Sequence, residues 1–147
     1  RMDLHADDRE LLESTLPHEI THLVLGELLD GDVPMWANEG CATQAESARK
    51  RRHYRRTLAR FLPRVYPLSV LLETRVYPEP PFTRLFYAQS ASLVRLLLQG
   101  GTPGDLIAFL ELARRRGYDH ALQQIYNLSG LEELQQLWHT SLSQPED

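Results

Sequence analysis

Apolar residues recur every three or four positions along most of this chain, and that spacing predicts amphipathic helices rather than strands. We expect the first helix at about residues 8–29 and the second at about 35–61, ending before Pro63. Residues 63–82 hold five of the nine prolines, which predicts an irregular crossover with one short helix at about 67–73. Further helices are expected at about 83–99, 103–116, 119–126 and 130–142.

The ends of these helices carry local signals. Thr102 followed by Asp105, and Ser129 followed by Glu132, both resemble capping boxes, in which a hydroxyl and a carboxylate satisfy free amide groups of the first turn. Pro17 lacks an amide hydrogen, so we expect the first helix to start or kink there.

One face of the first helix is apolar. At ~100° per residue, the side opposite the histidines at positions 18 and 22 collects four large apolar side chains. We expect this face to pack on a hydrophobic core, so that the helix is covered on both sides. The four residues are Leu12, Leu16, Ile20 and Leu23.

The same patterns define the fold class. No segment alternates apolar and polar residues as a half-buried strand would, and residues 1–6 could form one short edge strand at most. A chain of 147 residues is long enough to bury a core as one domain, which we expect to cover residues 1–147. The sequence therefore predicts a mainly α, single-domain fold.

Composition and charge narrow the functional classes. A formal net charge of −4 gives no general attraction to polyanions, and no nucleic-acid partner is expected. The single Cys41 excludes an intrachain disulfide, and no apolar run approaches the ~18 residues needed to cross a bilayer. Because the chain begins at Arg1 without a signal-peptide pattern, we expect a soluble segment of a longer protein. The exported or envelope-associated part of a longer bacterial protein is one location that the sequence allows.

The strongest chemical signal is an HExxH motif on the first helix. His18 and His22 are four positions apart, so their side chains lie about 40° apart on one face and can bind one ion. Glu19 points to a neighbouring face, where its carboxylate can accept a proton from a metal-bound water without being a ligand. The motif predicts a divalent-metal site with Glu19 as general base.

A third ligand is needed, because catalytic zinc sites usually have three protein ligands and one position for water. Glu39 is the candidate, with sixteen residues between it and His22. At this point the chain resembles the gluzincin zinc metallopeptidases, in which a glutamate from a second helix completes HExxH. The resemblance is carried by Leu16–His22, which matches a Leu-Pro-His-Glu-x-x-His helix, and by Trp36–Gly40, which matches Trp-x-x-Glu-Gly. Both patterns are those of the small bacterial peptidase-MA-like group.

This resemblance implies a gluzincin-like helical catalytic domain that uses Zn²⁺ to hydrolyse a peptide or protein substrate. Aminopeptidase-N-like and thermolysin-like enzymes are more distantly similar. The spacing between His22 and Glu39 is two residues shorter than in the aminopeptidase-N-like enzymes, and no upstream sheet is present. A Gly-Ala-Met-Glu-Asn motif for the substrate's N-terminal amine is also absent, so endopeptidase activity is the expected variety.

Three further residues are candidates around the metal. Tyr87 opens a Tyr-x-Gln-Ser segment that looks like the one downstream of the metal site in peptidase-MA-like proteins, which implies a donor to the reaction's oxyanion. Glu46 is seven residues after Glu39, about 20° away around the predicted helix, and a carboxylate there can orient a ligating imidazole. Asn38 is a candidate for a similar supporting contact.

Two other functional readings stay open. The first is a catalytically silent metal-binding or peptide-binding module of a larger protein, against which the presence of Glu19 argues. The second is a nucleic-acid binder, suggested by the basic run at residues 49–56. That run lies on a predicted helix whose inward stripe is Tyr54, Leu58 and Phe61, and basic runs are more often solvated helix faces.

Overall fold

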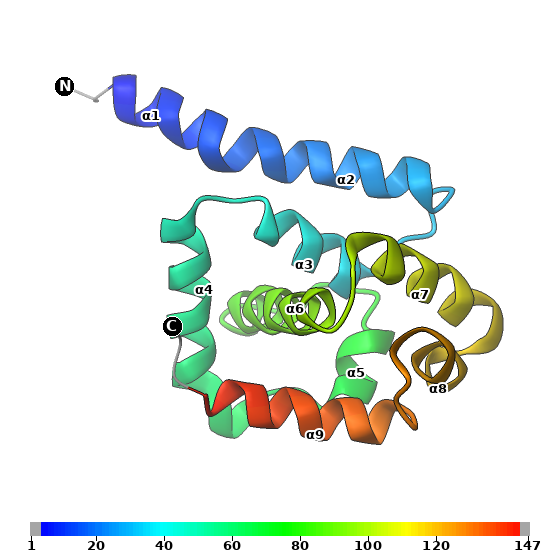
Figure 1. Ribbon diagram of the computed structural model, residues 1–147. Coiled ribbons are helices and arrows are strands. Elements are labelled where there is room, and N and C mark those ends of the chain that lie inside the picture. The colour runs from blue at the N-terminus through cyan, green and yellow to red at the C-terminus, as the bar shows by residue number, and fades with distance from the viewer. Residues whose placement is uncertain (1–3, 145–147) are drawn as a thin grey trace.

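The computed structural model describes residues 4–144 of the chain (Figure 1). Within this range the secondary structure is helical and no strand forms, which confirms the mainly α class. Residues 4–6 belong to the first helix, so they do not form the short edge strand that the sequence allowed; residues 1–3 lie outside the described range. No helix of the described part is long and apolar enough to cross a membrane.

The HExxH motif lies on one long helical segment along an edge of the molecule (Figure 1). This segment consists of α1 (Leu4–Glu10), a π-helical turn (Leu11–Thr15) and α2 (Leu16–Leu28). In the π-helical turn the Leu16 amide donates to the carbonyl of Leu11, five residues earlier. The irregularity expected near Pro17 therefore takes the form of a wide turn just before the proline, as happens where one residue is inserted into a helix.

The prediction of one continuous helix at 35–61 is wrong, because the chain forms two helices there. These are α3 (Met35–Gln44) and α4 (Ala48–Phe61), and Figure 1 shows α4 turning away from α3. Ser47 has extended backbone angles, and its side chain accepts a hydrogen bond from the Lys50 amide. A serine that caps a new helix in this way competes with continuation of the old one, which is why periodicity alone missed the break.

The core surrounds α6 (Phe82–Gln99), which lies in the middle of the other helices in Figure 1. Between α4 and α6 the chain forms a 3₁₀ turn (Leu62–Arg64) and α5 (Leu68–Glu73), which confirms the short helix expected in the crossover. The largest fully buried side chains of the core come from four different helices: Trp36, Phe86, Phe109 and Trp138.

The backbones of α3 and α6 approach each other closely at Gly40. A Cβ atom at this position would lie 2.6 Å from the backbone oxygen of Ser90 and 2.5 Å from Cγ2 of Val94. A side chain larger than hydrogen cannot fit there without moving backbone. The glycine that follows Glu39 therefore fixes how deeply α3 sits against α6.

The last elements are α7 (Pro103–Arg116), α8 (Tyr118–Ala121), a π-helical turn (Leu122–Tyr126) and α9 (Leu131–Leu142). The capping box expected at the start of α7 is confirmed by reciprocal bonds between Thr102 and Asp105. The one expected before α9 is wrong. Gly130 is the cap residue, and the amide of Ser129 donates to Glu133 rather than being part of a box with Glu132.

The apolar face of the first helix is exposed, contrary to the expectation that it packs on a core. Helix α2 contacts α3 through its histidine side, where Leu25 is buried, and the other helices lie on that side in Figure 1. Periodicity identifies an apolar face but not the element that covers it, and within residues 4–144 nothing does so. The exposed fractions are 63% for Leu12, 44% for Leu16, 48% for Ile20 and 74% for Leu23.

Candidate metal centre

Two imidazole rings on α2 face each other at the boundary between α2 and α3. The Nε2 atoms of His18 and His22 are 3.0 Å apart, and the ring planes are inclined by 80°. One helical turn separates the two residues, so their side chains project from the same face, as the sequence predicted. Two ring nitrogens are thereby directed at one point in space.

Helix α3 brings a carboxylate to the same point. Oε2 of the buried Glu39 lies 3.6 Å from Nε2 of His18 and 3.7 Å from Nε2 of His22. The three groups lie close enough together to hold a metal ion. For comparison, a tetrahedron with ligand bonds of ~2.0–2.1 Å has edges of ~3.3–3.4 Å.

The bonding of Glu39 indicates that a cation fits here. Its Oε2 atom is buried and has no hydrogen-bond partner among the described residues. A buried carboxylate oxygen without a partner is costly, and a cation placed between it and two imidazole nitrogens would remove that cost. Two histidines and one carboxylate also form a donor set typical of catalytic zinc.

Each histidine is oriented through its other ring nitrogen. Nδ1 of His18 lies 2.5 Å from Oε1 of Glu46, and Nδ1 of His22 lies 2.7 Å from Oδ1 of Asn38. Because both partner oxygens accept hydrogen bonds, Nδ1 is the donor in each ring, and in a ring with this tautomer the lone pair lies on Nε2. This is the arrangement that a metal-ligating imidazole requires.

Glu46 reaches His18 from a different place than the sequence argument assumed. It lies in the turn between α3 and α4, not on a continuous helix two turns after Glu39. The guanidinium of Arg51 donates to the backbone oxygens of Glu46 and Gln44, the latter at 3.2 Å, and so fixes this turn. The contact that supports His18 therefore depends on the break that divides the predicted helix.

Glu19 lies beside the histidines on α2 and is exposed. Its carboxylate makes no hydrogen bond or ion pair within the described part of the chain. The buried partners of the two imidazoles are Glu46 and Asn38, so Glu19 is not used to orient the rings. A free carboxylate at the solvent side of the site is able to accept and return a proton.

The sequence analysis missed Tyr77. This residue lies in the extended segment between α5 and α6, and its hydroxyl donates to Oε1 of Glu39 at 2.5 Å. Burial, and after it the hydrogen bond to Glu39, raises the pKa of Tyr77. No local signal identifies such a residue, because the path of a proline-rich crossover is set by tertiary packing and not by periodicity.

Tyr87 packs against Tyr77 beside the metal centre. It is on α6, and its ring stacks on that of Tyr77 with centroids 6.1 Å apart and planes inclined by 23°. Burial, followed by the charge of Glu39, raises the pKa of Tyr87. The ring of Tyr54 lies near that of Tyr87, with centroids 6.4 Å apart and planes inclined by 37°. Tyr77 therefore contacts the site directly, Tyr87 packs against it and Tyr54 lies beside Tyr87, where the sequence analysis had selected Tyr87 alone.

Comparison with known proteins agrees with this geometry. The family model described as the Peptidase MA superfamily matches residues 4–144, which is nearly the whole chain. No curated protein and no solved structure is significantly similar to it.

Proposed function

Since the chain belongs to the peptidase MA superfamily, we propose that it hydrolyses peptide bonds with a zinc ion held by His18, His22 and Glu39. The observation that carries this proposal is the convergence of two Nε2 atoms on a buried carboxylate oxygen that lacks a protein partner. A zinc ion bound there would acidify a water molecule and polarise the carbonyl group of the substrate.

The chain's own residues would handle the protons. Hydrolysis forms a bond between the water oxygen and the carbonyl carbon and breaks the bond between that carbon and the amide nitrogen. Glu19 would accept the proton that the water loses and deliver it to the departing amine. Its exposure and its lack of a partner within residues 4–144 leave it available for both transfers.

The negative charge that develops on the carbonyl oxygen needs a further donor. We assign this role to Tyr87, because the hydroxyl of Tyr77 is already donated to Glu39. Loss of one such donor typically lowers the rate by 10²–10³. Tyr87→Phe is therefore expected to lower kcat by about that factor while zinc stays bound.

Metal analysis combined with a cleavage assay tests the proposal. The wild-type protein should bind about one zinc per chain and cleave a generic unfolded protein such as labelled casein. Glu19→Gln should keep the zinc and lose cleavage by about 10²–10⁴-fold. Glu27→Gln, an exposed carboxylate two turns further along α2, is the matched control and should stay active.

The same assay separates the alternative function. Wild-type protein that binds zinc and cleaves no peptide would be a metal-binding module without turnover, and the peptidase proposal would then be wrong. Protein that binds no zinc would contradict both the peptidase and the metal-binding module, and would leave a peptide-binding module as the remaining alternative. A peptide or protein is the proposed substrate, and endopeptidase action predicts internal fragments rather than single amino acids.

A further inference from the structure

The helical segment that carries the HExxH motif meets the region between α3 and α4 at three successive levels. The residues that it contributes are four positions apart, so they lie on one face of the segment. The three pairs are Glu10 with Lys50, Ser14 with Ser47, and His18 with Glu46. Because the third pair includes a proposed zinc ligand, the first two pairs are placed where they can affect the metal centre.

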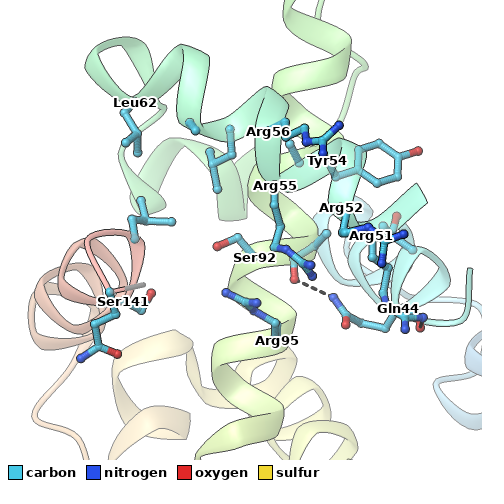
Figure 2. Close-up of a pocket in the computed structure, with 17 residues that line it drawn as sticks. Gln44, Arg51, Arg52, Tyr54, Arg55, Arg56, Leu62, Ser92, Arg95 and Ser141 are labelled. Atoms are coloured by element: carbon cyan, nitrogen blue, oxygen red, sulfur yellow. Dashed lines mark hydrogen bonds between the residues drawn. The ribbon is translucent and has the colours of Figure 1, made fainter. Parts of the chain in front are cut away.

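The backbone of the turn between α3 and α4 is fixed by two other parts of the chain. The backbone amide of Ser47 donates to the hydroxyl of the buried Ser14 at 3.1 Å. The side-chain amide of Gln44 donates to the carbonyl of Ala91 on α6 at 2.8 Å, and Figure 2 shows this bond as a dashed line. These contacts hold the backbone, and they leave the orientation of the Glu46 carboxylate to be set by its own partners.

The two oxygens of the Glu46 carboxylate have different surroundings. Oε1 accepts the Nδ1–H of His18, while Oε2 is buried and has no hydrogen-bond partner among the described residues. Nζ of Lys50 lies 3.9 Å from Oε2, which is too far for a hydrogen bond and close enough for an ion pair. The Glu46 side chain is only 3% exposed, so solvent screens this attraction weakly. Lys50 therefore attracts the second oxygen and leaves the first on the histidine.

Glu10 keeps the ammonium group of Lys50 in this place. Oε1 of Glu10 lies 2.9 Å from Nζ of Lys50, and Oε2 lies 2.8 Å from Nη2 of Arg49. Hydrogen bonds from Lys50 and Arg49 lower the pKa of Glu10, which favours its charged form. The two neighbouring cations thus share one carboxylate. Within the described part of the chain, Lys50 also forms an ion pair with Glu46 and Arg49 does not.

We propose that Lys50 is a positioning residue of the metal centre, held by Glu10 and acting on His18 through Glu46. Its ammonium group keeps the carboxylate of Glu46 in the orientation that receives the Nδ1–H of His18, so that Nε2 stays directed at the ion. The inference rests on the proposed function, because it takes His18 as a zinc ligand. It also gives the start of the basic run at residues 49–56 a use inside the fold.

Zinc affinity tests this role on the two neighbouring cations, by competition with a chromophoric chelator. Lys50→Gln should weaken zinc binding about three- to tenfold, less than the 10–100-fold usual for a residue bonded directly to a ligand. Arg49→Gln is the matched control, because it removes a partner of Glu10 and leaves the contact with Glu46. It should bind zinc as the wild type does. Lys50→Arg keeps the positive charge and should restore most of the affinity.

A double variant tests the part that Glu10 plays. Glu10→Gln should weaken zinc binding less than Lys50→Gln does, because the charge of Lys50 remains near Glu46. The double variant should bind about as weakly as Lys50→Gln alone, since both changes act through one path. Additive losses would contradict the proposed chain of contacts.

A measurement without zinc separates this inference from the proposed function. In the metal-free protein at constant pH, NMR of the histidine rings detects the hydrogen bond between Nδ1 of His18 and Glu46. Lys50→Gln should shift the Nδ1–H signal of His18, and Arg49→Gln should not. The ring signals of His22, which is bonded to Asn38, are the internal reference and should stay unchanged in both variants.

Two results would overturn the inference. One is a Lys50→Gln variant with the zinc affinity and the His18 signal of the wild type; if the wild type cleaves peptides, the proposed function then stands without it. The other is an equal change in Arg49→Gln and Lys50→Gln, which would reduce the role of Lys50 to attaching α1 to α4. If the wild type binds no zinc, the proposed function is wrong, and the His18 signal still decides whether Lys50 orients that ring.

Discussion

Tyr77 donates its hydroxyl hydrogen to Oε1 of Glu39, and only Oε2 of that carboxylate is directed at the two imidazole nitrogens. The tyrosine thus selects which oxygen of Glu39 faces the site. A carboxylate held in this way is prepared to bind a metal through one atom, without rotating when the ion arrives. Preorganisation of this kind usually raises metal affinity.

We therefore expect Tyr77→Phe to weaken zinc binding by about 10–100-fold. The measurement is a competition titration against a chromophoric chelator. Tyr66→Phe is the control, because Tyr66 is bonded to Gln89 through its backbone amide and carbonyl and not through its hydroxyl. Equal affinities for Tyr77→Phe and the wild type would show that the hydrogen bond does not orient the ligand.

Glu46 gives a second prediction on metal affinity. Its carboxylate accepts the Nδ1–H of His18, so Glu46→Ala should lower zinc affinity by about 10–100-fold. Glu46→Gln keeps an accepting oxygen but loses the charge, and its effect should be smaller. A Glu46→Gln variant that binds zinc as weakly as Glu46→Ala would indicate that charge, and not orientation of the ring, is what matters.

Two glycines make a matched test of helix packing. Gly40→Ala places a methyl group 2.6 Å from the backbone oxygen of Ser90, and should cost about 1–3 kcal/mol of unfolding free energy. Gly26→Ala, inside α2, meets no atom within 4 Å and should instead add about 0.5–1 kcal/mol. Urea denaturation of the two variants measures both. Similar changes for the two would contradict the close approach of α3 and α6.

The exposed face of α2 is tested by two leucines from the same helix. Leu25→Ala removes a buried side chain and should cost about 2–5 kcal/mol. Leu23→Ala removes one that is 74% exposed and should change stability by about 0.5 kcal/mol or less. If Leu23→Ala were as destabilising as Leu25→Ala, another part of the protein would have to cover that face.

Much of the helical fold could be predicted from the sequence, because helical periodicity and proline positions are local information. The helices beginning at Leu68, Phe82 and Pro103 lie within a residue of where the pattern placed them. The division of the second helix was not predicted, since Ser47 can be read either as an ordinary helical residue or as a cap.

For the metal centre, too, the features that could be predicted are those that depend on local sequence. The spacing of His18 and His22 is a property of one helix, and a second helix was expected to bring Glu39 to them. A contact between Glu46 and a ligating imidazole was expected on helical geometry that the chain does not adopt, and the imidazole it reaches is that of His18. Tyr77 could not be found, because its approach to Glu39 depends on how an irregular segment crosses the core. Local patterns do not encode such a path.

The π-helical turn just before Pro17 contains one more residue than an α-helical turn. Its extra residue can therefore be gained or lost without changing which way the side chains of α2 point. Deleting one residue from Leu11–Thr15 would convert the wide turn to an ordinary α-helical one, which absorbs the deletion, so the upstream segment would keep nearly its orientation and the two imidazoles would keep their places. A one-residue insertion or deletion at this turn is thus tolerated during evolution without disturbing the metal centre on α2.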